Sequence, residues 1–442
     1  MRRSLVVVAA AAAAVLSGGS LHAQGSAVDQ QSACMAGRGV AGVALPCTDG
    51  SAVFFNPAAI AEQGSVVSVG AAIVRSSNVF RYDPDYRRGG DPESVKRDPA
   101  VIPVPQAYLS YRATPRLAAG LAVLAPYGLG LEWPVCPIDD PRCAGPNFEG
   151  RFTGYDNALR GIYVQPTLAY QLLPGRLSLG AGLDYVRGSL EVNRRLFGPA
   201  ALGFGTTEIG DVRLEGSGTG FTYHLAALAH LGPSASLGVR YLGSAEVDLS
   251  GDATFTQIST GLPPIDAAIG AQFPADQGVA TTIEFPAQLV VGVAARATDR
   301  LNLMADWQRT YWSSFDAFDV DFAGNAPDEV LELGYQDVNT FRFGVEFAAT
   351  DALDLRAGFR YNEAATPRAT PLLPEGERNV YSLGLGYRAT RALSADLSFQ
   401  HIAQPDRAGP LVPGGPRAGI YESVGHVVNF TVAYRFGGAG IR

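Results

Sequence analysis

The stretch TFRFGVEFAATDALDLRAGFRYN, residues 340–362, alternates apolar and polar side chains on both sides of a short turn, AATDAL. On each side every second residue is apolar, and the residues between them include arginine, aspartate and glutamate. Because side chains of a strand alternate between its two faces, this period of two predicts two strands, each with one apolar face. The same pattern returns in VYSLGLGYRAT (380–390), LSADLSFQ (393–400) and VNFTVAYRF (428–436).

Strands of this kind could form a soluble sandwich or a membrane barrel. The apolar faces often begin or end in an aromatic residue, as the girdles of an outer-membrane barrel do, and the polar faces carry full charges along their middle. We therefore expect a barrel whose apolar face meets lipid and whose charges line a wide, wet interior. The residues expected to face lipid are Phe341, Phe343, Val345, Phe347, Leu353, Leu355, Phe359, Leu383, Leu385, Phe430 and Val432.

The connections between the apolar stretches alternate in length. Short turns share one wording, as in RATPRL (112–117), RATDRL (296–301), AATDAL (348–353) and RATRAL (388–393). Tight periplasmic turns and long outer loops are typical of outer-membrane barrels. The long connections are rich in Gly, Pro, Asp and Asn and cover about 77–103, 128–157, 193–212, 251–280, 313–337, 363–378 and 402–423.

These connections predict an all-β fold, a 14-stranded antiparallel transmembrane β-barrel, which occupies residues 65–442 and carries long extracellular loops. An even strand number places both ends of the barrel in the periplasm. Several strands exceed the length needed to cross a membrane, so they should project beyond the outer surface. The predicted strands are 65–76, 104–113, 116–127, 158–171, 176–192, 213–231, 234–250, 281–296, 299–312, 338–348, 351–362, 378–389, 392–402 and 424–436.

The first residues predict export. Two arginines, an apolar run from Leu5 to Leu16 and a small-residue stretch are typical of a secretory signal peptide, assigned to residues 1–23. No later apolar run is long enough for a transmembrane helix. The formal net charge is −8 and Lys96 is the only lysine, which argues against a nucleic-acid surface. The 52 glycines and the 10% aromatic content favour a β protein with many turns.

The four cysteines form two local pairs in the sequence. An exported chain favours the disulfides Cys34–Cys47 and Cys136–Cys143 over free thiols. A zinc site is the competing interpretation, but neither spacing is typical of one and both pairs lie in loop sequence. We expect no metal and no cofactor.

Residues 24–64 precede the first strand and do not alternate. They contain AGRGVAGVA and the stretch DGSAVFFNPAAIAEQG (49–64), in which Asn56-Pro57 interrupts any regular pattern. The segment is too small to fold well alone, and a wide barrel leaves an interior to fill. We therefore expect residues 24–64 to form an N-terminal hatch that plugs the barrel from the periplasmic side.

The chain resembles the long-chain fatty acid transport proteins of the Gram-negative outer membrane, the FadL-type channels, which include transporters of aromatic hydrocarbons. The resemblance extends over nearly the whole mature chain. Ala59 occupies the position of the glycine in the family's usual sequence, Asn-Pro-Ala-Gly-Leu-Ala; we expect it to stiffen the turn slightly and to change little else. The matching stretches are GRGVAGVA…DGSAVFFNPAAIA within 37–61, LAPYGLGLEW (124–133), GRFTGYDNALRGIYVQPTLAYQL (150–172) and FPAQLVVGVAARATDRLNLMADWQRTYWSSF (285–315).

The resemblance implies passive uptake of hydrophobic compounds, with capture in an outer apolar groove, an inner site against the hatch and release sideways into the membrane. The hatch residues given a gating or ligand-facing role are Phe54, Phe55, Asn56, Pro57 and Ala58; core packing alone is the alternative. The groove is assigned to Leu129, Leu131, Trp133, Phe148 and Phe152 in the loop 128–157, although these residues could simply pack the loop onto the barrel. Arg151 is a candidate anchor for a carboxylate, with a structural ion pair as its alternative.

The resemblance also implies a kink in the third strand that opens the wall beside the hatch. Gly120, Pro126 and Gly128 are the candidates, because proline lacks a ladder donor and glycine permits a bend. Gly120 is preferred, since Pro126 and Gly128 could merely end the strand.

The sequence argues against two other classes of function. An enzyme needs a nucleophile, a base and an orienting acid, and no histidine of the mature chain lies in a recognisable catalytic sequence, so no enzyme is expected. A general porin would lack a hatch. The expected protein is a monomer in the outer membrane, in contact with outer-membrane lipid and a hydrophobic small-molecule ligand. We expect the barrel-assembly machinery to insert it, because an aromatic final strand is typical of chains that are inserted into the outer membrane.

Overall fold

The computed structural model describes residues 28–87, 92–97, 100–138, 148–198, 207–315, 317–374, 376–412 and 415–437. The predicted signal peptide lies outside these residues, as does Cys143. Within the described ranges, no helix is long and apolar enough to cross a membrane.

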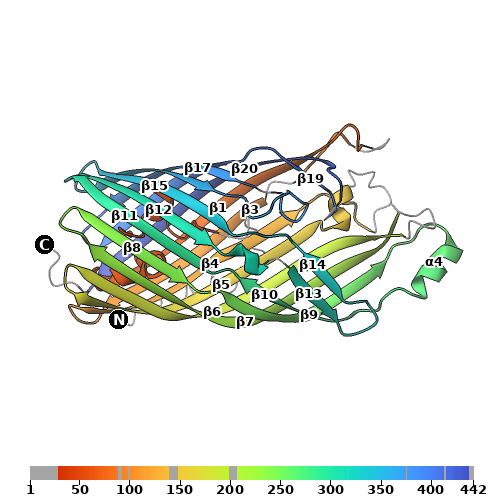
Figure 1. Ribbon diagram of the computed structural model, residues 1–442, viewed down its shortest axis with the longest axis horizontal. Coiled ribbons are helices and arrows are strands. Elements are labelled where there is room, and N and C mark those ends of the chain that lie inside the picture. Colours follow the sequence, from red (N-terminus) through yellow and green to blue (C-terminus); the bar gives the residue numbers. More distant parts are fainter. Residues whose placement is uncertain are drawn as a thin grey trace.

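The fold is a closed barrel of fourteen antiparallel strands. The last strand pairs with the first along the full length of both, from Ser65 opposite Phe436 to Tyr82 opposite Gly419, which closes the ring. The described chain ends, at residue 437, at the end of the barrel that carries the short turns (Figure 1). The wall consists of β1 (Ser65–Tyr82), β3 (Ala100–Arg112), β4 (Leu117–Glu132), β5 (Asp156–Leu173), β6 (Leu177–Phe197), β7 (Glu208–His230), β8 (Ala235–Leu242) with β9 (Ala245–Gln257), β10 (Gln277–Phe285) with β11 (Gln288–Thr298), β12 (Leu301–Thr310), β15 (Val338–Ala348), β16 (Leu353–Asn362), β17 (Arg378–Arg388), β18 (Leu393–Ala403) and β20 (Gly419–Phe436).

The outer end carries further short elements between the wall strands. Helix α4 projects farthest from the barrel in Figure 1, whereas β13 and β14 pair with each other nearer the wall, where β13 also pairs with β10. These elements are β2 (Ser94–Lys96), η2 (Glu149–Phe152), α4 (Pro263–Gly270), η4 (Trp312–Phe315), β13 (Ala317–Phe322), β14 (Glu329–Glu332) and β19 (Arg407–Gly409).

All fourteen predicted strands are present, and most differences lie at their outer ends. For example, β1 extends to Tyr82 and β20 begins at Gly419, beyond the predicted limits of 76 and 424. Two predicted strands are divided, one between Leu242 and Ala245 and one between Phe285 and Gln288. The second break contains Pro286, which cannot donate a ladder hydrogen bond.

The predicted orientation of the strand faces is confirmed. Along β15, Phe343 is 52% exposed on the outer wall, whereas its neighbour Arg342 is only 3% exposed. Leu353 and Phe359 are half-buried, and the other nine residues expected to face lipid are exposed. The apolar side chains therefore form the outer surface, as a membrane barrel requires.

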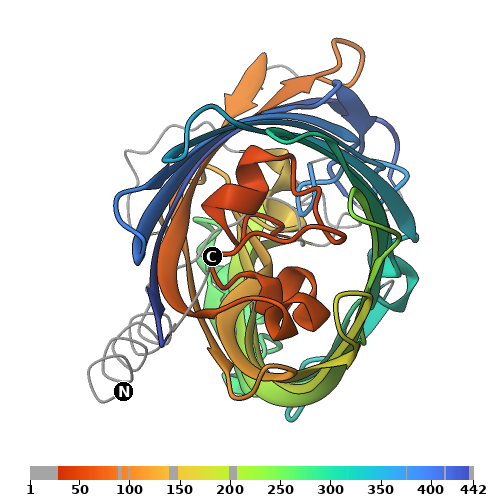
Figure 2. The same ribbon diagram turned by 90° about the vertical axis from the view of Figure 1, so that its left-hand side faces the viewer.

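The N-terminal segment occupies much of the barrel interior, and a pocket lined by charged residues such as Arg38, Glu346 and Asp396 remains beside it. Three short helices, α2 (Ala33–Gly37), α3 (Ala52–Phe55) and η1 (Pro57–Ala61), lie inside the ring of strands (Figure 2). Glycines of the wall strands allow the backbone of the N-terminal segment to pack directly against the backbone of the wall. A Cβ atom at Gly180 would lie 2.5 Å from Ala58 N, and one at Gly238 would lie 2.2 Å from Val43 O. We call residues 28–64 the hatch.

Candidate functional site

Asn56 holds the centre of the hatch together. Its side-chain oxygen accepts from Ala58 N at 3.1 Å, which caps η1 where Pro57 begins it. Its amide nitrogen donates to Val43 O at 2.6 Å and to Ala227 O of β7 at 3.2 Å. One fully buried side chain thus joins two parts of the hatch to the wall.

Charged contacts attach the other side of the hatch to the wall. Asp29 lies 2.8 Å from Arg360 and 3.3 Å from Arg342. Burial alone would raise the pKa of the Asp29 carboxyl, but these arginines hold it below its usual value. Asp306 of β12 accepts from the backbone N–H groups of Gly42, at 2.7 Å, and Val43, at 3.0 Å.

Cys34 and Cys47 form a disulfide that closes the first loop of the hatch. Cys136 is also disulfide-bonded, while Cys143, its predicted partner, lies outside the described residues. Among the described residues no group of three His, Cys, Asp or Glu side chains is placed to hold a metal ion.

A small apolar cavity, partly open to solvent, lies at the outer end of the barrel. Strands β6, β7, β9, β10 and β13 supply its walls. Arg194 and Glu329 form an ion pair beside it. The apolar residues that line it are Leu190, Val192, Leu214, Leu249, Val279 and Val320.

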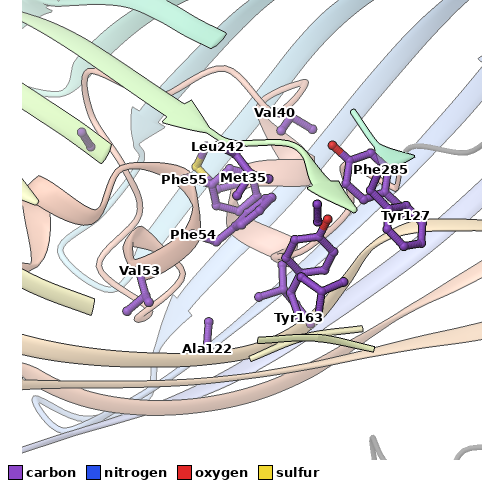
Figure 3. Packing of buried hydrophobic residues seen from close by; sticks show 14 of the residues in the cluster. Met35, Val40, Val53, Phe54, Phe55, Ala122, Tyr127, Tyr163, Leu242 and Phe285 are labelled. Carbon is purple, nitrogen blue, oxygen red and sulfur yellow. The ribbon is translucent and has the colours of Figure 1, made fainter. Parts of the chain in front are cut away.

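The cavity is continuous with the packing around the hatch. Leu249 belongs to the same buried apolar cluster as Phe54 and Phe55 of α3. Between them lie Tyr127 and Phe285, whose rings stack at 5.3 Å. Figure 3 shows Phe54 and Phe55 facing Tyr163, with Tyr127 and Phe285 beyond it. We call this row of side chains, Leu249, Phe285, Tyr127, Tyr163, Phe54 and Phe55, the apolar column.

Two polar groups lie in or beside the apolar column. Arg240 of β8 is 3% exposed; its guanidinium lies 4.4 Å above the Phe54 ring and donates to Phe54 O at 3.2 Å and to Gln288. No carboxylate of the described residues lies within ion-pair distance of Arg240, which is unusual for a buried charge. The Tyr163 hydroxyl is buried and has no hydrogen-bond partner within the described part of the chain.

The wall is interrupted where β4 passes the hatch. Pairing between β3 and β4 stops at Ala107 opposite Val123, and the pairing with β5 shifts register between Leu124 and Tyr127. Residues 122–128 are buried on both faces, so this part of β4 turns into the interior. The hatch occupies the inner side of the break, since Val28 N donates to Pro126 O at 2.8 Å.

The break corrects the preferred candidate for the kink. Gly120 pairs normally with Ser110 on β3 and with Thr167 on β5. A Cβ atom there would lie 2.7 Å from a Val53 methyl group, so this glycine makes room for the hatch. Pro126 lies at the break. Gly128 is beyond it and pairs with Arg160, and β4 continues to Glu132, so neither residue ends the strand.

The predicted groove residues do not line the outer cavity. Trp133 and Phe148 are fully buried, stack at 4.4 Å and pack with Phe80 and Tyr421 in a separate core beneath the outer loops. The Trp133 indole donates to Pro371 O at 3.0 Å. Loop packing, the alternative interpretation, describes them correctly.

The other predicted groove residues are scattered. Leu131 is buried, and Leu129 packs at the edge of the main cluster. Phe152 contacts Phe197 and lies under the Arg151 guanidinium at 4.3 Å. Arg151 forms an ion pair with Glu208, the arrangement that the alternative interpretation of this arginine expects.

Apart from Phe54 and Phe55, the residues that line the cavity and the column are not identified by the sequence. Arg240 and Leu249 lie on the inward face of a predicted strand, and nothing in that alternation distinguishes them from other inward residues. Tyr127 and Tyr163 lie in the stretches that carry the family resemblance, which was the one available signal.

One buried histidine has the contacts expected of a catalytic base. His224 Nδ1 lies 2.7 Å from Asp184 Oδ1, and His224 Nε2 lies 3.0 Å from Thr167 Oγ1. All three side chains are at most 3% exposed, so a substrate has no access to the hydroxyl. His224, Asp184 and Thr167 therefore form a buried polar network within the wall.

Comparisons with known proteins agree with this geometry. Residues 14–436 match the family model described as outer membrane protein transport protein (OMPP1/FadL/TodX). Outer membrane protein P1 of Haemophilus influenzae is 22% identical over 432 residues, covering 88% of each chain. The structure of a Pseudomonas aeruginosa FadL homologue superposes with a TM-score of 0.81 at 22% identity, covering 93% of this chain and all of the other. The Ralstonia pickettii toluene transporter TbuX superposes with a TM-score of 0.65 at 20% identity, with 93% and 100% covered.

Proposed function

Because the chain belongs to the outer membrane protein transport family (OMPP1/FadL/TodX), we propose that it is a passive channel that takes up hydrophobic compounds, long-chain fatty acids or related lipids and hydrocarbons, across the outer membrane. The observation that carries the proposal is the apolar column, whose side chains belong to one buried apolar cluster that reaches from the outer cavity to the hatch. Hydrophobic solutes need such a path because a binding site for them must be largely apolar.

The proposed route has three stages. The outer cavity captures the compound, the apolar column passes it to the hatch, and the break between β3 and β4 releases it sideways. The hatch favours this exit over a route straight through, because Asn56, Asp29 and Asp306 fix it to the wall. The gating role expected for Phe54 and Phe55 is retained in this proposal, because these two residues end the column (Figure 3).

Arg240 favours a cargo with a carboxylate head. A buried guanidinium that lacks a carboxylate partner gains most from an anionic group brought to it. Arg342 lies on the same small cavity beside Phe54 and Phe55. An acyl chain in the apolar column would then place its carboxylate beside Arg240.

Uptake by a strain lacking its own transporters tests the proposed route. Leu249→Asp puts a charge into the outer cavity and should reduce uptake of palmitate and of hexadecane alike. Ser250→Asp is the matched control, because Ser250 is the next residue of β9 and is exposed on its other face. Equal uptake by the two variants, both folded by heat-modifiable gel migration, would remove the outer cavity from the route.

Arg240→Met tests the cargo class separately. It should lower palmitate uptake relative to hexadecane, whereas an equal effect on both compounds would show that Arg240 serves the hatch alone. A general porin, the alternative, would pass sugars, so rapid swelling of liposomes in small sugars would contradict the hydrophobic channel.

A further inference from the structure

Three basic side chains meet on the outer wall of the barrel. In the ladder, His401 of β18 is directly opposite His426 of β20, and His426 is directly opposite Arg75 of β1. Directly opposite residues on one face have Cβ atoms about 5 Å apart. His426 and Arg75 are exposed and His401 is half-buried, with the same parity as the lipid-facing Val428 and Phe430. We call these three residues the basic triplet.

The basic triplet lies near the outer end of the apolar band of the wall. On β20 the outward residues from Tyr434 to Val428 are apolar and His426 follows; beyond it lie Val424, which is 37% exposed, and then Glu422. At the same level the neighbouring outward residue of β17 is Tyr381, directly opposite His401. An apolar band of about 25 Å flanked by aromatic residues is the signature of the membrane-embedded wall, so the triplet lies at its outer edge.

The protein itself leaves hydrogen-bond donors of the triplet free. His401 Nδ1 and His426 Nε2 are 3.2 Å apart and their rings 5.1 Å apart. One of these nitrogens must donate and the other accept, so in either tautomer the pair of neutral rings keeps one further N–H. Arg75 makes no hydrogen bond or ion pair with any described residue, unlike Arg81, which pairs with Glu422 farther out.

We propose that the basic triplet binds the phosphate of a phosphorylated glycolipid of the outer leaflet. The guanidinium of Arg75 supplies charge and paired donors, and the imidazole N–H supplies a third donor from the neighbouring strands. Charge at this depth matches the level at which a lipid presents its headgroup while its acyl chains cover Val428 and Phe430. The Phe399 ring stacks on the His426 ring, with the two ring centroids 5.9 Å apart.

The site also adjoins the break in the wall. Arg75 is directly opposite Val101 of β3, which is 64% exposed, and β3 is the strand that loses its partner β4 beyond Ala107. A lipid bound at the triplet would lie beside the outer part of that break. The inference rests on the register and the outward charges, and it stands whether or not cargo leaves through the break.

Native mass spectrometry of the detergent-solubilised protein with diphosphorylated lipid A tests the proposal. Wild-type protein should retain one lipid A, and Arg75→Ala should bind it about fivefold more weakly. The variant with Arg75→Ala, His401→Ala and His426→Ala should bind it more weakly still. Arg187→Ala is the matched control, because Arg187 is an exposed outward arginine at a similar distance along β6 and has no histidine opposite it.

Two further arms separate the headgroup from other causes. Lipid A freed of phosphate should bind wild-type protein as weakly as diphosphorylated lipid A binds the triple variant. Millimolar inorganic phosphate should not displace bound lipid A, because the acyl chains contribute to binding. Equal retention by wild-type and triple-variant protein, both folded by gel migration, would overturn the proposal. Equal binding of phosphate-free lipid A, or displacement by phosphate alone, would overturn it as well.

Discussion

Asn56→Ala should loosen the hatch without unfolding the barrel. The substitution removes three hydrogen bonds, to Val43 O, to Ala227 O and from Ala58 N. At about 1 kcal/mol net for each, the free energy for opening the hatch should fall by roughly 3 kcal/mol. Since 1.4 kcal/mol corresponds to a factor of ten, amide hydrogens of residues 28–64 should exchange about a hundredfold faster.

Hydrogen exchange followed by mass spectrometry measures this directly in lipid nanodiscs. Ser68→Ala is the matched control, because Ser68 is equally buried on the inner wall but its hydroxyl has no partner among the described residues. Peptides from the wall strands should be unchanged in both variants. If exchange in the hatch is the same in Asn56→Ala as in Ser68→Ala, the conclusion that Asn56 fastens the hatch is refuted.

The remaining predictions concern the wall, the disulfide and an outer loop. Leu383→Arg, in the middle of the lipid face, should reduce the unfolding free energy in vesicles by about 2–4 kcal/mol, and Tyr387→Arg near the periplasmic edge by less; equal losses in urea titrations would contradict the depth assignment. Replacing Cys34 and Cys47 with serine should destabilise the hatch by roughly 3 kcal/mol, seen as faster exchange in its peptides, whereas unchanged exchange would show that the closed loop adds nothing. Hydroxyl groups that donate to Asp266 lower its pKa, so this carboxylate should order its loop at neutral pH and release it as the pH falls below the ordinary aspartate value; an NMR titration midpoint above that value would contradict the contact.

The wall could be predicted closely because membrane strands obey a simple rule. One face meets lipid, so alternation identifies each strand, and the turn wording identifies each periplasmic end. The disulfide between Cys34 and Cys47 followed from local pairing in the same way. The disulfide depends on residues that are close in the sequence, and the wall strands depend on a lipid environment that is the same for every strand.

The candidate site could not be predicted as well, because it depends on which inward faces meet. Trp133 and Phe148 are aromatic and lie in a long loop, yet they pack against Phe80 rather than line a cavity. Gly120 looked like a hinge, but its small size serves the hatch that crosses it. Arg240 could not be identified from the sequence, because the feature that distinguishes it, the absence of an ion-pair partner among the described residues, depends on the three-dimensional structure.

The most direct test of the proposed route is to close the break between β3 and β4 and measure uptake. Cysteines at Pro105 and Ala125, joined by a short bis-maleimide, would connect the two strands just beyond their last pair. The control joins cysteines at Leu109 and Leu121, which already lie directly opposite each other. Sideways release predicts that the first cross-link abolishes uptake of radiolabelled palmitate while binding at the outer cavity persists, and that the control changes neither. Full uptake with the break closed would contradict the account and favour a passage through the hatch.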